Sequence, residues 1–302
     1  MGQVGFYATH HVHYFCLIRP ERPIGWARWY TPNPTWPKMS FFCVTLRDMF
    51  VDTHTHFYDE WLLPDAEAAI QRALEAGVGK MIQADVDSHE RPDMWAIGNR
   101  YPGVVYQMLG LYPGSVKDDW REELDALEPY KDKGIVAIGE IGLDYHEGLE
   151  FVKEQKEVLR LQLEMAARMD LPVNFHLRDA WEDFFTILAD CKHLHLRGNL
   201  HCFTASYEIY ERANKYGDFS VGIGGVVTFK NASLAKTLER IPLEKILLET
   251  DAPYLAPAPN RGRRNESSYL PLIAEKVAQV KGLTTQEIAR ITTHNAETLF
   301  QI

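Results

Sequence analysis

The chain has 302 residues, of which 46% are hydrophobic and 25% charged, and its formal net charge is −10. The acidic balance excludes the basic face of a typical static nucleic-acid-binding protein, although carboxylates that hold divalent metals would add to it. Four scattered cysteines without CxxC spacing argue against a zinc ribbon or a disulfide framework, and no apolar run reaches the roughly 18 residues of a membrane span. We therefore expect a cytoplasmic globular protein.

Residues 1–48 differ in composition from the rest of the chain. They contain five prolines, with five basic against two acidic residues, and show neither a helical nor an alternating apolar period. His10, His11 and His13 lie here without a periodic scaffold that could hold them as a metal site. We interpret the segment as an N-terminal extension that is disordered or lies upstream of a natural start at Met49. A targeting or partner-binding arm is the alternative.

Residues 49–302 alternate short apolar runs with amphipathic stretches, the pattern of repeated βα units. Their number is close to the roughly 250 residues of a TIM-type (β/α)8 barrel, which is the fold we predict. The apolar runs predict strands at residues 49–53, 78–83, 104–109, 135–139, 172–175, 197–200, 219–223 and 245–248. Helices are expected between them, including 65–76 with Asp65 as its N-cap and Gly77 at its C-terminal end, 151–169, 269–280 and 285–300.

Residues that can bind metals follow or end five of the predicted strands. They are His54 and His56 after the first strand, Glu140 after the fourth, His176 and His201 at the ends of the fifth and sixth, and Asp251 after the eighth. A lone histidine at a strand end is more often structural, and Glu140 alone would also fit a salt bridge. Because the carboxyl ends of barrel strands converge on one mouth, the set together predicts a metal site.

Six such ligands suit two divalent cations, Mg²⁺, Mn²⁺ or Zn²⁺, bridged by one carboxylate. Glu140 is the predicted bridge, with the two histidines after the first strand on one cation and His176 and His201 on the other. Asp251 is predicted to be a ligand and the general base that accepts a proton from the attacking water. Glu140 and Asp251 are therefore the candidate catalytic residues.

Several segments resemble signature sequences of the TatD family of metal-dependent deoxyribonucleases. They are VAIGEIGLDY, LPVNFHLRDA, HCFTAS, VVTFKN and LLETDAPYLAP, and the resemblance runs from MFVDTHTH to NAETLF, over nearly all of residues 49–302. It implies an amidohydrolase-like TIM barrel, a two-metal centre at the six positions above, and DNase activity, often as a 3′→5′ exonuclease on single strands. The expected partner is therefore single-stranded DNA, and we expect the protein to be a monomer.

Tyr112, in GLYPGSV, departs from the family pattern. Family members usually carry a histidine here that is thought to contact the scissile phosphate. We expect the tyrosine hydroxyl to take over that contact, because it can donate a hydrogen bond although it is uncharged at neutral pH. Further phosphate contacts are expected from basic residues at strand ends or in the loop after the eighth strand: Arg178, Lys230, Arg261 and Arg264. A solvated loop is the alternative for Arg264.

Two other functions fit the same residues. One is a D-aminoacyl-tRNA deacylase or another carboxylic-ester or lactone hydrolase, because the same site would activate water toward carbon or phosphorus. The other is a non-catalytic nucleic-acid-binding or scaffold protein, against which six converging ligands argue. Assays with a labelled oligonucleotide, a charged tRNA and a lactone would separate these functions.

Overall fold

The computed structural model describes residues 49–146, 148–230 and 233–302, and the predicted extension at 1–48 lies outside them. Eight parallel strands form one sheet in the order β1 to β8, each paired with the next. They are β1 (Phe50–Thr55), β2 (Val78–Gln83), β3 (Val105–Leu109), β4 (Ala137–Asp144), β5 (Val173–Arg178), β6 (Arg197–Leu200), β7 (Asp218–Ile223) and β8 (Ile246–Leu248). The predicted amidohydrolase-like (β/α)8 barrel is confirmed.

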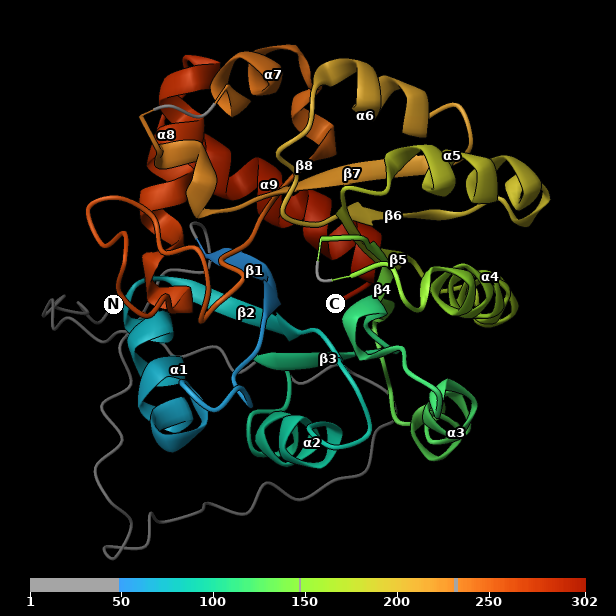
Figure 1. Ribbon diagram of the computed structural model, residues 1–302. Coiled ribbons are helices and arrows are strands. Elements are labelled where there is room, and N and C mark those ends of the chain that lie inside the picture. The colour runs from blue at the N-terminus through green and yellow to red at the C-terminus, as the bar shows by residue number, and fades with distance from the viewer. Residues whose placement is uncertain (1–48, 147, 231–232) are drawn as a thin grey trace, which may run out of the picture. The chain divides into compact units, whose positions relative to one another are not determined.

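The helices surround this sheet, as Figure 1 shows for the barrel. They are α1 (Ala66–Glu75), α2 (Arg91–Arg100), α3 (Trp120–Asp125), α4 (Val152–Met169), α5 (Trp181–Asp190), α6 (Tyr207–Ala213), α7 (Leu234–Arg240), α8 (Leu270–Lys281) and α9 (Thr285–Phe300). In the described part of the chain, no helix combines the length and apolar character needed to cross a membrane.

The core of the described residues has two main parts, beside a small cluster of Leu111, Val116, Trp120 and Val158. The larger lies between the strands and the outer helices. The smaller contains Val51 and Ala137, near the beginnings of β1 and β4, together with Ala296 and Phe300 of α9. Because α9 packs against residues of several strands, it closes one end of the barrel interior and leaves the other end for polar side chains.

The seam between β1 and β8 closes the barrel. One parallel bridge joins Thr55 to Ala252, and the Asp251 amide donates to the His54 carbonyl at 2.9 Å. The buried carboxylate of Asp52 accepts from the Thr250 amide at 2.9 Å and from the Thr250 hydroxyl at 2.6 Å. Burial raises the pKa of Asp52 to about 6, although these hydrogen bonds lower it. The seam therefore places the segment after β8 against the end of β1.

Three strands extend further than the sequence predicted. β1, β4 and β5 continue to Thr55, Asp144 and Arg178, so His54, Glu140 and His176 lie within strands. The prediction that the first two of these residues follow their strands is therefore wrong. The apolar runs stop earlier because the side chains in the barrel interior change from apolar to polar while the backbone pairing continues.

Helix α1 begins and ends close to the predicted residues. Gly77 follows it with a φ of 86°, as expected for a glycine after a helix C-terminus. Asp65 occupies the N-cap position, but its side chain makes no capping hydrogen bond. Its carboxylate instead pairs with Arg264 and Arg72.

A buried ion pair next to β4 joins the segment after β2 to the first residue of α2. Asp85, directly after β2, accepts from Arg91 Nε at 2.7 Å and from the Gly110 amide at 3.1 Å. The Asp85 carbonyl accepts from the Glu140 amide at 3.0 Å. Both side chains of the pair are 1% exposed, so neither charge can be solvated if the other is removed.

We predict that Arg91→Met lowers the free energy of unfolding by about 3–5 kcal/mol, because it leaves the Asp85 carboxylate buried without its cation. Arg100→Met, on the same helix, is the control: Arg100 is 58% exposed in its pair with Glu67, and the loss should be about 0–1 kcal/mol. Urea unfolding measures both. Equal losses in the two variants would contradict the assignment.

Candidate metal centre

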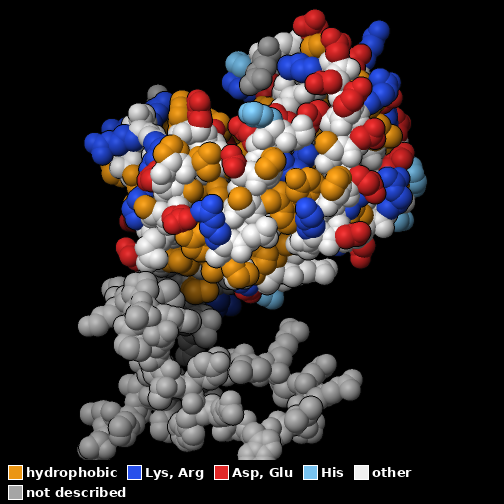
Figure 2. Space-filling view, turned by 90° about the horizontal axis from the view of Figure 1, so that it is seen from below, with side chains coloured by type: hydrophobic (Ala, Val, Ile, Leu, Met, Phe, Trp, Pro, Cys, Tyr) orange, Lys and Arg blue, Asp and Glu red, His pale blue; other side chains and the backbone are white. Residues whose placement is uncertain are grey.

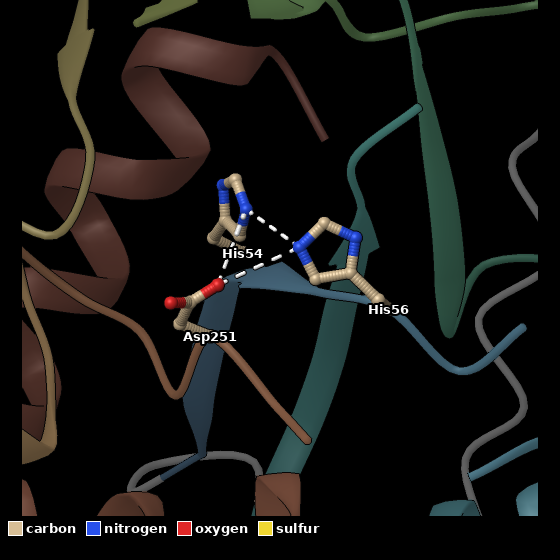
Figure 3. Close-up of side chains that lie close together, drawn as sticks. All are labelled: His54, His56 and Asp251. Carbon is tan, nitrogen blue, oxygen red and sulfur yellow. Dashed lines mark hydrogen bonds and ion pairs between the residues drawn. The ribbon is translucent and has the colours of Figure 1, made fainter. Parts of the chain in front are cut away.

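Three of the predicted ligands meet across the seam between β1 and β8. The Nε2 atoms of His54 and His56 lie 3.0 Å apart, and Asp251 Oδ1 lies 3.6 and 3.5 Å from them. Figure 3 shows the two rings and the carboxylate pointing toward one another. The arrangement leaves one common point that all three donor atoms can face.

Glu140, within β4, connects this group to the histidines of β5 and β6. Its Oε1 lies 2.7 Å from His176 Nδ1 and 2.9 Å from His201 Nε2. Its Oε2 faces the other way, 3.3 Å from His54 Nε2 and 3.8 Å from His56 Nε2. The two oxygens of one carboxylate therefore serve two separate pairs of imidazoles.

The structure contains two sets of three described residues whose donor atoms all lie within 4.8 Å of one another. One set is His54, His56 and Asp251, and the other is His54, Glu140 and His201. His54 Nε2 is common to both sets, whereas the sequence placed this residue on one side only. His176 Nδ1 is also close to the second set, 3.2 Å from His201 Nε2. All six predicted residues are therefore brought together.

The six side chains are largely shielded from water, with exposed fractions of at most 16%. Burial opposes ionisation of Glu140, but His201, His54 and His176 outweigh it and hold the pKa of Glu140 well below its usual range. Burial also opposes protonation of His201, yet Glu140 and Glu249 raise the pKa of His201 well above its usual value. When no cation is bound, protons on the histidines therefore compensate the negative charge of the buried carboxylates.

The outer nitrogen of His56 has a partner that determines where its proton lies. Tyr58 Oη lies 2.8 Å from His56 Nδ1 and donates its single proton to the Ala84 carbonyl. Toward His56 the hydroxyl can therefore only accept, so Nδ1 carries a proton. Nε2, which faces Asp251 and His54, is then the nitrogen that gives up its proton and presents a lone pair when a cation is held.

His176 and His201 show the same arrangement with carboxylates. His176 Nε2 lies 2.8 Å from Asp144 Oδ2, and His201 Nδ1 faces Glu249 Oε1 at 3.6 Å. A carboxylate only accepts, so the hydrogen bond to Asp144 places a proton on the outer nitrogen of His176. Glu249, beyond hydrogen-bonding distance, favours a proton on His201 Nδ1 by its charge. The inner nitrogens of both rings face Glu140. The donor set thus fits divalent cations, because orientation by an outer acceptor is typical of metal-binding histidines.

A pocket of about 800 Å³ opens above these residues. Glu140, His176, His201 and Asp251 line its floor, and Tyr112 lies at its side. Its walls differ in charge. Arg178 lies on the side of β5, whereas Asp59, Asp87 and Glu90 line the wall formed by the segments after β1 and β2.

The predicted substrate contacts are only partly brought to this pocket. Tyr112 and Arg178 line it, and the Tyr112 hydroxyl donates to Asp144 Oδ2 at 3.3 Å. Among the described residues, Lys230, Arg261 and Arg264 are not part of its lining. The guanidinium of Arg261 lies over the Phe229 ring, 4.4 Å from its centroid. Arg264 pairs with Asp65, the residue at the N-cap position of α1.

On the face shown in Figure 2, basic and acidic side chains of the described residues are interspersed, and no continuous basic surface is visible there.

Sequence reasoning missed the residues behind the histidines, which include Tyr58, Asp144 and Glu249. Tyr58 lies two residues after His56, Asp144 follows the EIGL segment, and Glu249 lies two residues before Asp251. A polar residue two to four positions from a predicted ligand was a signal that could have found them.

The chain was compared with families and proteins of known sequence. Residues 51–301 match the family described as TatD related DNase. The metal-dependent hydrolase YabD of Bacillus subtilis is 39% identical over 261 residues, which cover 84% of this chain and all of that protein. A Salmonella typhimurium protein named 3′-5′ ssDNA/RNA exonuclease TatD is 34% identical over 245 residues, 79% of this chain and 94% of its own.

Solved structures show the same similarity. The Escherichia coli TatD homolog YjjV has a TM-score of 0.77 at 29% identity, covering 84% of this chain and 98% of its own. An amidohydrolase from Saccharomyces cerevisiae has a TM-score of 0.71 at 17% identity and matches in fold. It covers 84% of this chain and all of its own.

We predict that binding of Zn²⁺ or Mn²⁺ releases protons, because the raised pKa of His201 keeps a proton in the metal-free site that a cation must displace. The release should be larger at pH 6 than at pH 9, and the apparent affinity should rise with pH. Calorimetry in two buffers of different ionisation enthalpy measures the number of protons. His201→Asn should release fewer, and no release at pH 6 would contradict the prediction.

Proposed function

The chain belongs to the TatD family of metal-dependent hydrolases, and we propose that it hydrolyses phosphodiester bonds in single-stranded DNA, removing nucleotides from the 3′ end. The observation that carries this proposal is the position of Glu140, whose two oxygens serve two groups of donors at the floor of an open pocket. The similarity to a Salmonella protein named 3′-5′ ssDNA/RNA exonuclease supports the substrate class.

In this proposal two divalent cations, Mg²⁺, Mn²⁺ or Zn²⁺, are held at the six residues. His54, His56 and Asp251 would hold one, His176 and His201 would hold the other, and Glu140 would serve both. The distances of 2.7 and 3.2 Å from His176 Nδ1 to Glu140 and His201 support its inclusion. Such a pair of cations activates water and stabilises the charge that develops on a phosphate.

Asp251 is the proposed proton acceptor. Burial raises the pKa of this carboxyl group, but the hydrogen bond from His56 and the charges of His201 and His54 outweigh burial and lower it. The group is therefore ionised at neutral pH and can take a proton from the attacking water. Its position at the pocket floor gives it access to substrate.

Arg178 is the proposed phosphate contact nearest to the reacting bond, since it lines the pocket opposite the acidic wall. Its planar group can bind two phosphate oxygens at once. Lys230 and Arg261, both exposed, are proposed to contact the strand further from the metal centre. Arg264 is the weakest member of this set, because its guanidinium already pairs with Asp65.

A carboxylic ester with a positively charged group, such as the aminoacyl end of a tRNA, is the second candidate substrate. The acidic wall formed by Asp59, Asp87 and Glu90 supports it, because three carboxylates beside the floor attract an ammonium group. Burial and the neighbouring Asp87 and Asp59 raise the pKa of Glu90, which agrees with closely spaced carboxylates.

The test is a panel of substrates with wild type and Glu140→Gln. The wild type should shorten a 3′-hydroxyl oligonucleotide with Mg²⁺ or Mn²⁺, and the variant should lose at least about 100-fold in rate, since one electrostatic contact at a reacting centre supplies about that much. A charged tRNA and a lactone are assayed in parallel. Hydrolysis of the charged tRNA alone would favour the second candidate, and full activity of Glu140→Gln would refute the site.

Tyr112→Phe tests the proposed phosphate contact, in which the Tyr112 hydroxyl turns from Asp144 and donates its single proton to the phosphate. Loss of one hydrogen bond to a charged group, worth about 1.5–3 kcal/mol, predicts a fall in kcat/KM of about 10- to 100-fold. The metal content should not change. Tyr106→Phe, which removes a hydroxyl that donates to the Gly103 carbonyl outside the site, is the control. Unchanged turnover of Tyr112→Phe would reject the contact.

A further inference from the structure

The partner behind His54 is an amide, whereas a hydroxyl lies behind His56 and carboxylates lie behind His176 and His201. His54 Nδ1 is 2.6 Å from the amide nitrogen Nδ2 of Asn174, and Asn174 Oδ1 accepts from Asn199 Nδ2 at 2.8 Å. Asn174 and Asn199 are paired residues of β5 and β6. All three side chains are fully buried, so water does not compete for these hydrogen bonds.

An amide differs from the other partners because it has both a donor and an acceptor. With Nδ2 toward His54, the amide donates to Nδ1, so the His54 proton lies on Nε2, toward His56 and Asp251. A protonated Nε2 cannot bind a cation. In the same arrangement Asn199 Oδ1 is buried without a hydrogen-bond partner in the described structure.

A half-turn of both amides changes each of these features. Asn174 Oδ1 then accepts from Nδ1 of His54, and Nδ2 of Asn174 donates to Asn199 Oδ1. The buried oxygen of Asn199 gains a partner while its nitrogen takes the oxygen's former place, and His54 Nε2 presents its lone pair to the site. In this orientation an acceptor faces the outer nitrogen of His54, as the Tyr58 hydroxyl faces the outer nitrogen of His56.

We propose that Asn174, held by Asn199, is a positioning residue that determines which nitrogen of His54 carries the proton. Its amide donates to His54 in the metal-free site and accepts from His54 when the cation is held. The inference rests on the proposed metal centre, and it assigns a role to two residues behind that centre. Because His54 Nε2 belongs to both sets of donor atoms, this orientation controls the cation held across the seam.

The first test compares Asn174→Asp with Asn174→Leu. A carboxylate at position 174 accepts from both His54 and Asn199, so Asn174→Asp should bind Zn²⁺ or Mn²⁺ within about threefold of wild type. Leucine offers no acceptor, and its affinity should fall about 10- to 100-fold, the usual loss when an outer partner is removed. Asn199→Asp should retain affinity, because a carboxylate there forces Asn174 Nδ2 toward it and Oδ1 toward His54.

A role in packing alone predicts the opposite order. Leucine has a similar volume and buries no charge, so Asn174→Leu would then be tolerated better than the buried carboxylate of Asn174→Asp. Thermal unfolding in a chelator measures folding of each variant without metal. A higher metal affinity for Asn174→Leu than for Asn174→Asp would overturn the proposal, and Asn199→Asp repeats the test should the leucine variant not fold.

The proton itself can be observed by ¹H–¹⁵N correlation spectra of the histidine rings. His54 should carry its proton on Nε2 in a chelator and on Nδ1 with Zn²⁺, and an unchanged position would overturn the proposal. Gln162→Glu, which alters a buried amide bonded to Leu111, is a control and should leave metal affinity unchanged. If His54→Ala binds metal as tightly as wild type, the proposed metal centre fails. If only the variants at 174 and 199 behave unexpectedly, the centre stands and this inference fails.

Discussion

The structure depends on one buried carboxylate with positive partners on both sides. Glu140 is 3% exposed, and its two oxygens face different pairs of histidines. A carboxylate in this position is stable only while imidazolium groups or cations compensate it. The barrel supplies that compensation by bringing residues of β1, β5 and the segments after β1, β6 and β8 to one end, and the Asp85 carbonyl, after β2, accepts from the Glu140 amide. Fold and site are therefore parts of one electrostatic arrangement.

The sequence predicts the order of the strands and the convergence of the six donors, because the carboxyl ends of parallel strands share one mouth. It could not predict where β4 and β5 end. Both strands continue with polar side chains such as Glu140 and His176, and polarity at the end of an apolar run also indicates a loop. The partner of Arg264 could not be predicted either. A basic residue in a loop looks the same in sequence whether it meets phosphate or, as here, Asp65.

The acceptors behind three of the histidines explain why the barrel interior is so polar at this end. Tyr58, Asp144 and Glu249 face the outer ring nitrogens of His56, His176 and His201, a support that apolar residues could not give. Burying such groups costs stability wherever a polar atom has no partner, as at Glu249 Oε2. The large apolar core between strands and helices offsets that cost.

The seam between β1 and β8 rests on one backbone bridge and on the contacts of Asp52 with Thr250. His54 and His56 belong to one side of it and Asp251 to the other. A cation shared by them would join the first strand of the barrel to the last, as a cross-link does. Local opening of the seam and escape of that ion then become coupled equilibria, because opening favours escape and a bound ion opposes opening. Exchange of backbone amide hydrogens along this seam would therefore report occupancy of the centre without any substrate.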